Sequence, residues 1–187
     1  MEAQILTLDN AGLPQAWVGI DEAITYHAKR MVAWSAGDIV CEYRGGMQRD
    51  GQRSRIATQS ILALRGASRA GRLPARTPAL SNALLFARDR HVCAYCAACF
   101  RPRELSCDHV MPVSKSGKHT WMNVVTACRG CNTRKADRTP EQAHMPLLYV
   151  PYTPNRYEHF ILRNRHILAD QMAFLLNGVP RTSRLHA

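Results

Sequence analysis

The chain has 187 residues, a length that suits one compact domain or a catalytic core with a smaller partner domain. Its formal net charge of +11 at pH 7 favours a polyanionic partner, most often nucleic acid. No apolar run reaches the roughly eighteen residues that a membrane-spanning helix needs, and residues 1–10 lack a secretory signal pattern. We therefore expect no membrane partner and a cytoplasmic location.

Residues 1–64 predict a small strand–helix–strand unit. Residues 4–8 alternate in polarity like a short strand, and a turn rich in Asp, Asn, Gly and Pro follows. Asp21 suits the N-cap of a helix that runs to about residue 34. Residues 39–43 and 60–64 predict two further strands.

The segment 44–76 is rich in arginine. Asp50 is its one acidic residue, and several Gly residues mark loops within it. We interpret the segment as phosphate-contacting, with a solvated linker as the alternative. Its end, 65–80, is the predicted linker, and the predicted DNA contacts there are Arg65, Arg69, Arg72 and Arg76.

The remaining elements lie on either side of a cysteine-rich region. Residues 82–89 predict a short helix, and Pro140 suits the first turn of another. A long amphipathic helix is expected over residues 156–176, with Asn155 as its cap and Gly178 as its stop. We expect a core domain at 81–150 and a segment 151–187 whose helix packs on that core. The apolar face of the helix also leaves a homodimer open.

Two Cys-x-x-Cys pairs predict a structural zinc site. A two-residue spacer lets both thiolates of a pair reach one tetrahedral ion, and two pairs complete a closed site. Bridged or free thiols are the alternative, but disulfides are rare in the reducing cytosol. The predicted Zn²⁺ ligands are Cys93, Cys96, Cys128 and Cys131, while Cys99 is expected to be a free thiol.

A second cluster of chemistry-bearing residues lies between and after these pairs. It comprises Asp108, His109, Pro112, Ser114, Gly117, Trp121, Asn123, Asn132 and Lys135. Taken singly, these residues suit turns, helix caps or a core histidine. Together with the cysteines, they closely resemble the motif of the HNH endonucleases. A looser resemblance to small bacterial HNH proteins covers most of the chain and favours a bacterial or phage origin.

The resemblance implies an α+β fold in which a ββα-metal core is stapled by the four-cysteine zinc site. The small N-terminal unit and the long C-terminal helix would complete the chain. Two departures from the family pattern concern turns. Ala97 stands where a Gly usually follows the first cysteine pair, and Ser116 replaces the first Gly of a Ser-x-Gly-Gly turn.

The residue types suit metal-dependent hydrolysis of DNA phosphodiester bonds. His109 is the predicted general base, and Asp108 and Asn132 supply oxygen ligands for one catalytic Mg²⁺ or Mn²⁺. By resemblance, this ion sits on the scissile phosphate and stabilises the leaving oxygen. Asn123 is expected to orient the loop that carries His109. Arg134 and Lys135 are expected to contact phosphates. His119 stays open between a phosphate-assisting residue and a surface histidine.

Two other functions are compatible with parts of the sequence. A non-catalytic zinc module could bind nucleic acid with the cysteines and arginines alone, but it would not need Asp108, His109 or Asn132. A subunit that cuts only within a larger defence or phage complex is the third reading. Double-stranded DNA is the default substrate, and RNA stays open.

Overall fold

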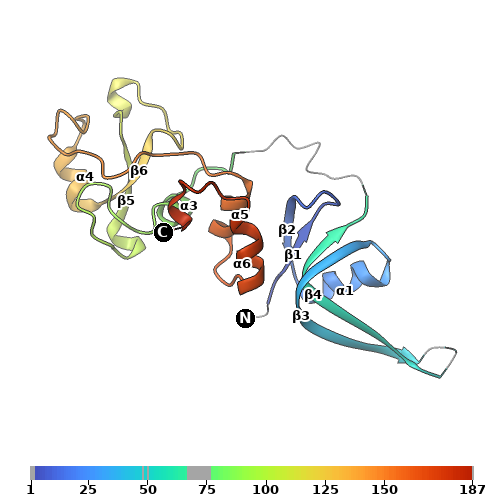
Figure 1. The fold of residues 1–187 in the computed structure, drawn as a ribbon. Helices are drawn as coiled ribbons and strands as arrows, with labels where there is room; N and C mark the ends of the chain where they lie inside the picture. Colours follow the sequence, from blue (N-terminus) through green and yellow to red (C-terminus); the bar gives the residue numbers. More distant parts are fainter. Residues whose placement is uncertain (1–2, 48, 50, 67–76, 187) are drawn as a thin grey trace. The chain divides into compact units, whose positions relative to one another are not determined.

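The computed structural model describes residues 3–47, 49, 51–66 and 77–186. The chain forms two compact units, of which the first combines Met1–Arg76 with Arg156–Gly178 and the second combines Thr77–Asn155 with Val179–Ala187. Figure 1 shows the helices and strands of both. The mixed helix and strand content confirms the α+β prediction. No helix in the described ranges is long and apolar enough to cross a membrane.

A four-stranded sheet forms the centre of the first unit. Its strand order is β2-β1-β4-β3, with β1 parallel to β4 and the other neighbours antiparallel. The strands are β1 (Ile5–Leu8), β2 (Pro14–Val18), β3 (Val32–Met47) and β4 (Arg53–Leu64). All four residues of β1 are buried, as expected for a central strand covered on both faces.

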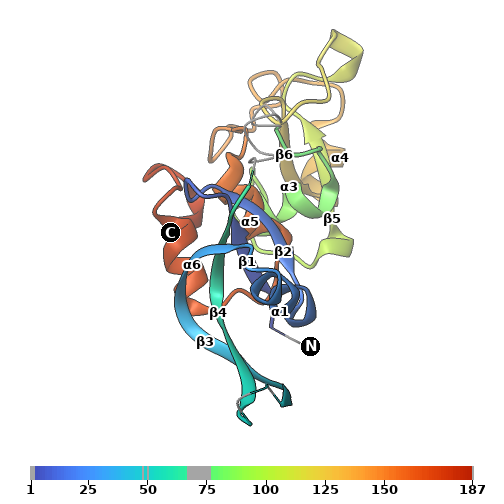
Figure 2. The same ribbon diagram turned by 90° about the vertical axis from the view of Figure 1, so that its right-hand side faces the viewer.

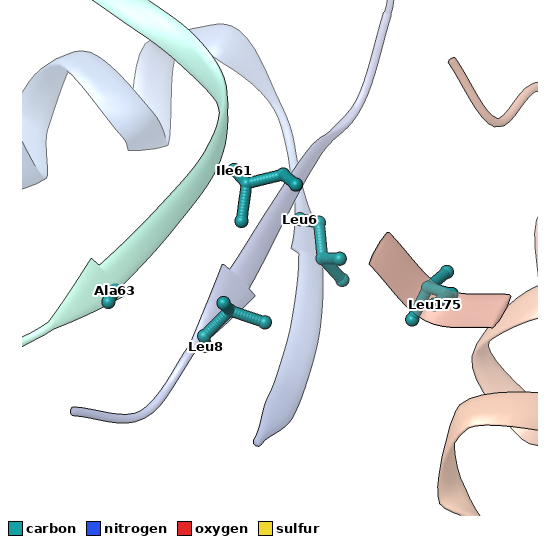
Figure 3. Packing of buried hydrophobic residues seen from close by; sticks show 5 residues of the cluster. All are labelled: Leu6, Leu8, Ile61, Ala63 and Leu175. Atoms are coloured by element: carbon teal, nitrogen blue, oxygen red, sulfur yellow. The ribbon is translucent and has the colours of Figure 1, made fainter. Parts of the chain in front are cut away.

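Helices cover the two faces of this sheet. Helix α1 (Ile20–Ala28) places Ala23 against Ile5, Val18 and Leu62 on one face. The other face carries Leu6, Leu8, Ile61 and Ala63, which pack with Leu175 of α6 (Ala169–Leu176) as Figure 3 shows. Because side chains alternate along a strand, neighbouring apolar residues of β1 supply both cores.

The strand predicted at residues 4–8 is confirmed, but the predicted helix over 21–34 ends early. Helix α1 stops at Ala28, and Arg30 takes a left-handed backbone conformation with φ of 55°. The Arg30 N–H donates to the His27 carbonyl at 2.9 Å and closes the end of the helix. Val32 then begins β3, where β-branched and aromatic residues fit a strand better than a helix.

The loops expected within the arginine-rich segment are wrong at residues 44–47 and 53–55, whereas Gly51 lies in a bend between the strands as expected. Residues 44–47 and 53–55 continue β3 and β4 as one long antiparallel hairpin, pairing Arg44 with Arg55 and Met47 with Arg53. The strands expected at 39–43 and 60–64 are parts of this longer hairpin. These residues form strands because β3 and β4 hydrogen-bond to each other. The charge composition of the segment does not predict this pairing.

The prediction of a single long helix over residues 156–176 is also wrong. The structure has two shorter helices, α5 (Arg156–Arg163) and α6, separated by a turn in which Asn164 Oδ1 accepts the His166 N–H at 3.0 Å. Both helices contribute side chains to the core on the sheet of the first unit. Helix α5 contacts β2, whereas α6 contacts β3 and β4 of the same sheet.

The second unit contains a ββα arrangement. Strands β5 (Leu105–His109) and β6 (Val124–Cys128) form an antiparallel pair, and α4 (Arg129–Lys135) follows β6 directly. Helix α3 (Asn82–Arg88) agrees with the prediction for 82–89 and packs Leu85 and Phe86 against Leu105, Trp121 and Val124. Short 3-10 turns lie at Pro102–Glu104, Val113–Lys115 and Arg184–His186. The helix expected at Pro140 is only a turn closed by Met145 N–H on the Pro140 carbonyl.

Candidate active site and zinc centre

The four predicted zinc ligands converge in the second unit. The Sγ atoms of Cys93, Cys96, Cys128 and Cys131 all lie within 4.8 Å of one another. Tetrahedral zinc with Zn–S bonds of about 2.3 Å holds its sulfurs about 3.8 Å apart, so the four residues fit the ion. Three of the cysteines are buried, and Cys99 is exposed and outside the cluster.

Backbone groups around the cluster favour thiolate ligands. The N–H of Cys131 donates to Cys128 Sγ at 3.4 Å at the start of α4, and Tyr95 N–H donates to Cys93 Sγ at 3.5 Å. Burial raises the pKa of Cys93, but the backbone hydrogen bonds that it accepts outweigh this and lower it to about 7. Ala97, which follows the first cysteine pair, has φ of 62°. This left-handed conformation favours glycine and explains why the family usually has one there.

Asp108 occupies a buried position on β5, where two side chains hold its carboxylate. Lys135 Nζ donates to Oδ1 at 2.9 Å, and the Tyr95 hydroxyl donates to Oδ2 at 2.5 Å. Burial and the neighbouring Asp108 charge together raise the pKa of Tyr95, so its hydroxyl stays a donor. Tyr95 lies within the first cysteine pair and therefore connects the four-cysteine cluster to this carboxylate.

Lys135 differs from the phosphate-contacting role expected of it. Its side chain is only 1% exposed, and Nζ also donates to the His109 carbonyl at 2.9 Å. A buried amine with these partners positions Asp108 and the adjacent backbone, and it does not form a surface contact. Arg134, its neighbour on α4, is exposed.

His109 ends β5 and faces a second histidine. Its Nε2 lies 3.0 Å from Nδ1 of His119, and the two ring centroids are 5.2 Å apart. Burial lowers the pKa of His109, and the nearby His119 and Lys135 lower it further against the opposing effect of Asp108. His109 is therefore largely neutral at pH 7, which is the form that can accept a proton.

Asn123 organises the loop between β5 and β6. Its side-chain oxygen accepts the Met111 N–H at 2.8 Å, and its Nδ2 donates to the carbonyls of Met111 and Lys118 at 3.0 and 2.9 Å. Gly117 lies so close to the Met111 carbonyl that an added Cβ would approach its oxygen to 1.8 Å. Ser116 has φ of 66°, the conformation that the usual glycine at this place would adopt most easily.

Asn132 is the third predicted catalytic residue near Asp108 and His109. It lies on α4, and its Nδ2 donates to Ser106 Oγ at 2.9 Å on β5. A shallow cavity of about 310 Å³ is lined by residues that include Asp108, His109, Asn132 and Lys135. Strand register and the helix that follows β6 thus gather residues from positions 108 to 135 around one opening.

Comparison with known proteins identifies this part of the molecule. Residues 93–148 match the family model described as HNH endonuclease. This segment is similar to the HNH endonucleases. A search of curated proteins found no matching relative. The match indicates a nuclease domain that acts on nucleic acid.

A buried arginine forms a hydrogen-bond network that stabilises the HNH domain. The Arg88 guanidinium forms two hydrogen bonds with the Asp89 carboxylate, at 2.8 and 3.1 Å. It also donates to the carbonyls of Trp121, Val124 and Tyr152 at 2.8 to 2.9 Å. Because Trp121 and Val124 lie two residues before and one residue after Asn123, Arg88 fixes the backbone from which Asn123 reaches the loop.

We expect Arg88→Met to lower the free energy of unfolding by about 3–5 kcal/mol, because Asp89 would remain buried without its counter-charge. Urea unfolding of the zinc-loaded protein measures this loss. Arg103→Met, at an exposed position, serves as the matched control and should change stability by about 0.5 kcal/mol or less. Equal stability of the two variants would show that the Arg88 network is not important for the fold.

The sequence did not predict roles for three residues of the HNH domain. Tyr95 and Arg88 carried no motif of their own, and His119 was left undecided. Of the predicted DNA-contacting arginines, Arg65 is exposed just after β4, while Arg69, Arg72 and Arg76 lie outside the described residues. Proximity to a Cys-x-x-Cys pair was the only available signal for Tyr95, and tertiary contacts revealed the other two.

Proposed function

We propose that the protein is a metal-dependent HNH endonuclease that hydrolyses phosphodiester bonds of DNA. The observation that carries the proposal is the convergence of Asp108, His109 and Asn132 on one cavity within the segment that matches the family. A non-catalytic zinc module would need the cysteines but has no use for this arrangement. A sulfur-lined zinc centre without an open position suits a structural role.

The residues at the cavity fit a divalent cation with oxygen ligands. Asp108 supplies carboxylate oxygen and Asn132 supplies amide oxygen, and such ligands suit Mg²⁺ or Mn²⁺ when water and phosphate complete the shell. Each carboxylate oxygen can accept more than one partner, so the hydrogen bonds from Lys135 and Tyr95 leave room for coordination. When bound, the ion supplies charge stabilisation of the phosphate and the leaving oxygen.

His109 is the proposed general base. With Nε2 held by His119, the other ring nitrogen, Nδ1, takes the proton from the attacking water. This requires that Nε2 carries the hydrogen and donates it to His119 Nδ1, so His119 sets the tautomer of His109. Asn123 holds the loop, and Lys135 holds the His109 carbonyl, so both fix the direction of the ring.

Incubation of zinc-loaded protein with supercoiled plasmid tests the proposal. We expect conversion to nicked or linear DNA only when Mg²⁺ or Mn²⁺ is added, because two protein oxygens alone do not neutralise the reacting phosphate. A structured RNA of similar length is incubated in parallel. Cleavage of RNA but not DNA would correct the substrate, and no cleavage of either by folded protein with any divalent metal would contradict the proposal.

A further inference from the structure

The outer part of the β3–β4 hairpin forms a two-stranded arm, which we define as Cys41–Met47 paired with Arg53–Thr58. Strand β1 pairs with β4 only at Ile61, Leu62 and Ala63, so it does not reach the arm. Figures 1 and 2 both show the hairpin extending away from α1 and the rest of its sheet. Two-stranded ribbons are only marginally stable in water by themselves, so a ribbon of this length is open to a partner.

One face of the arm is strongly basic. Arg44 lies directly opposite Arg55, and Arg53 lies two residues from Arg55, so the three side chains share a face. All three are exposed, and neither of the two ion pairs found among the described residues involves them. Glu42, opposite Ala57, is the one acidic residue of that face within the arm.

This arrangement favours a polyanion over a protein surface of mixed charge. Like charges directly opposite each other destabilise a strand pair, so Arg44 and Arg55 work against the hairpin unless a partner supplies negative charge. Duplex DNA supplies closely spaced phosphates, and its major groove, about 12 Å wide, admits a two-stranded β-ribbon. Met47, opposite Arg53 and 68% exposed, adds an apolar surface near the tip.

We propose that the basic face of the arm, Arg44, Arg53 and Arg55, binds duplex DNA and holds the substrate of the nuclease. The inference rests on the proposed function and adds a surface outside the HNH domain. The arm acts on affinity and not on bond cleavage, because its residues belong to the first unit and none of them lines the cavity at Asp108.

The test replaces Arg44, Arg53 and Arg55 together with Gln in the full chain. Binding to a short fluorescent DNA duplex is measured by anisotropy without Mg²⁺ over a range of salt concentrations. The matched control replaces Lys29, Arg163 and Arg165 with Gln, which removes the same charge from exposed positions of the first unit. We expect the arm variant to bind at least tenfold more weakly, with a salt slope lower by about two to three, since each phosphate contact contributes about 0.9.

Further variants separate the effect of charge from an effect on folding. Replacing the three arginines with Lys keeps the charge, so this variant should retain most of the DNA affinity and most of its salt dependence. The Gln variant should melt no lower than the parent, since it relieves the repulsion between Arg44 and Arg55. Equal binding by the arm and control variants would overturn the proposal. So would a loss confined to RNA, or to vesicles containing phosphatidylserine. Plasmid cleavage by the parent is scored separately, so inactive protein that still binds DNA through the arm contradicts only the nuclease function.

Discussion

Replacing His109 with Ala is expected to slow plasmid cleavage about a hundred- to ten-thousand-fold, the usual contribution of a general base. Zinc content, thermal stability and DNA affinity should stay close to those of the parent. His109 contributes one ring at the edge of the cavity, while the zinc cluster and the Arg88 network hold the domain together. His166→Ala, at an exposed position of the first unit, is the matched control and should cleave normally.

Variants of the proposed metal ligands should respond differently to added metal. Asp108→Asn and Asn132→Ala weaken coordination, so part of their activity should return at high Mn²⁺, whereas metal cannot replace the proton acceptor lost in His109→Ala. Asn is preferred to Ala at Asp108 because its amide oxygen can still accept from Lys135 Nζ, which would otherwise keep only the His109 carbonyl as an acceptor. Asn123→Ala should show an intermediate loss, since it only orients the loop. Full activity of correctly folded His109→Ala protein would exclude His109 as the base.

Replacing Cys128 with Ser is expected to remove the zinc and unfold the HNH domain. Structural zinc contributes about 10–16 kcal/mol to the folding of small zinc domains at neutral pH, which matches or exceeds the total stability of most domains. Cys128 is a predicted ligand, and its sulfur also accepts the hydrogen bond that starts α4. Elemental analysis should find about one Zn²⁺ per parent chain and almost none in the variant.

The matched control for the zinc experiment is Cys99→Ser. Cys99 lies close in sequence to the first cysteine pair but is exposed and outside the cluster, so this variant should keep its zinc and its melting temperature. Folded parent protein without zinc would contradict the structural metal site. If the Cys99 variant lost its zinc and the Cys128 variant kept it, Cys99 would be a zinc ligand and Cys128 would not.

The sequence by itself predicted the four-cysteine cluster, the candidate catalytic residues and the resemblance to the HNH endonucleases. These features depend on short spacings such as Cys-x-x-Cys and Asp-His, and local geometry allows few arrangements for them. The strand at residues 4–8 and the helix at 82–89 were also predicted correctly, because short elements of this kind leave local signals in the sequence. The four cysteines then converge as their spacing predicts.

Only the tertiary structure decided features that depend on contacts between distant segments. Pairing of Arg44 with Arg55 turned expected loops into a hairpin, and a turn at Asn164 divides the expected C-terminal helix into two helices that both pack on the sheet of the first unit. The fold also buried Lys135 beside Asp108 and brought His119 to His109. Charge and periodicity in the sequence show whether a residue is polar or apolar, but they do not show which residue it contacts in the folded protein. Long-range hydrogen bonding and burial therefore set the role of these residues.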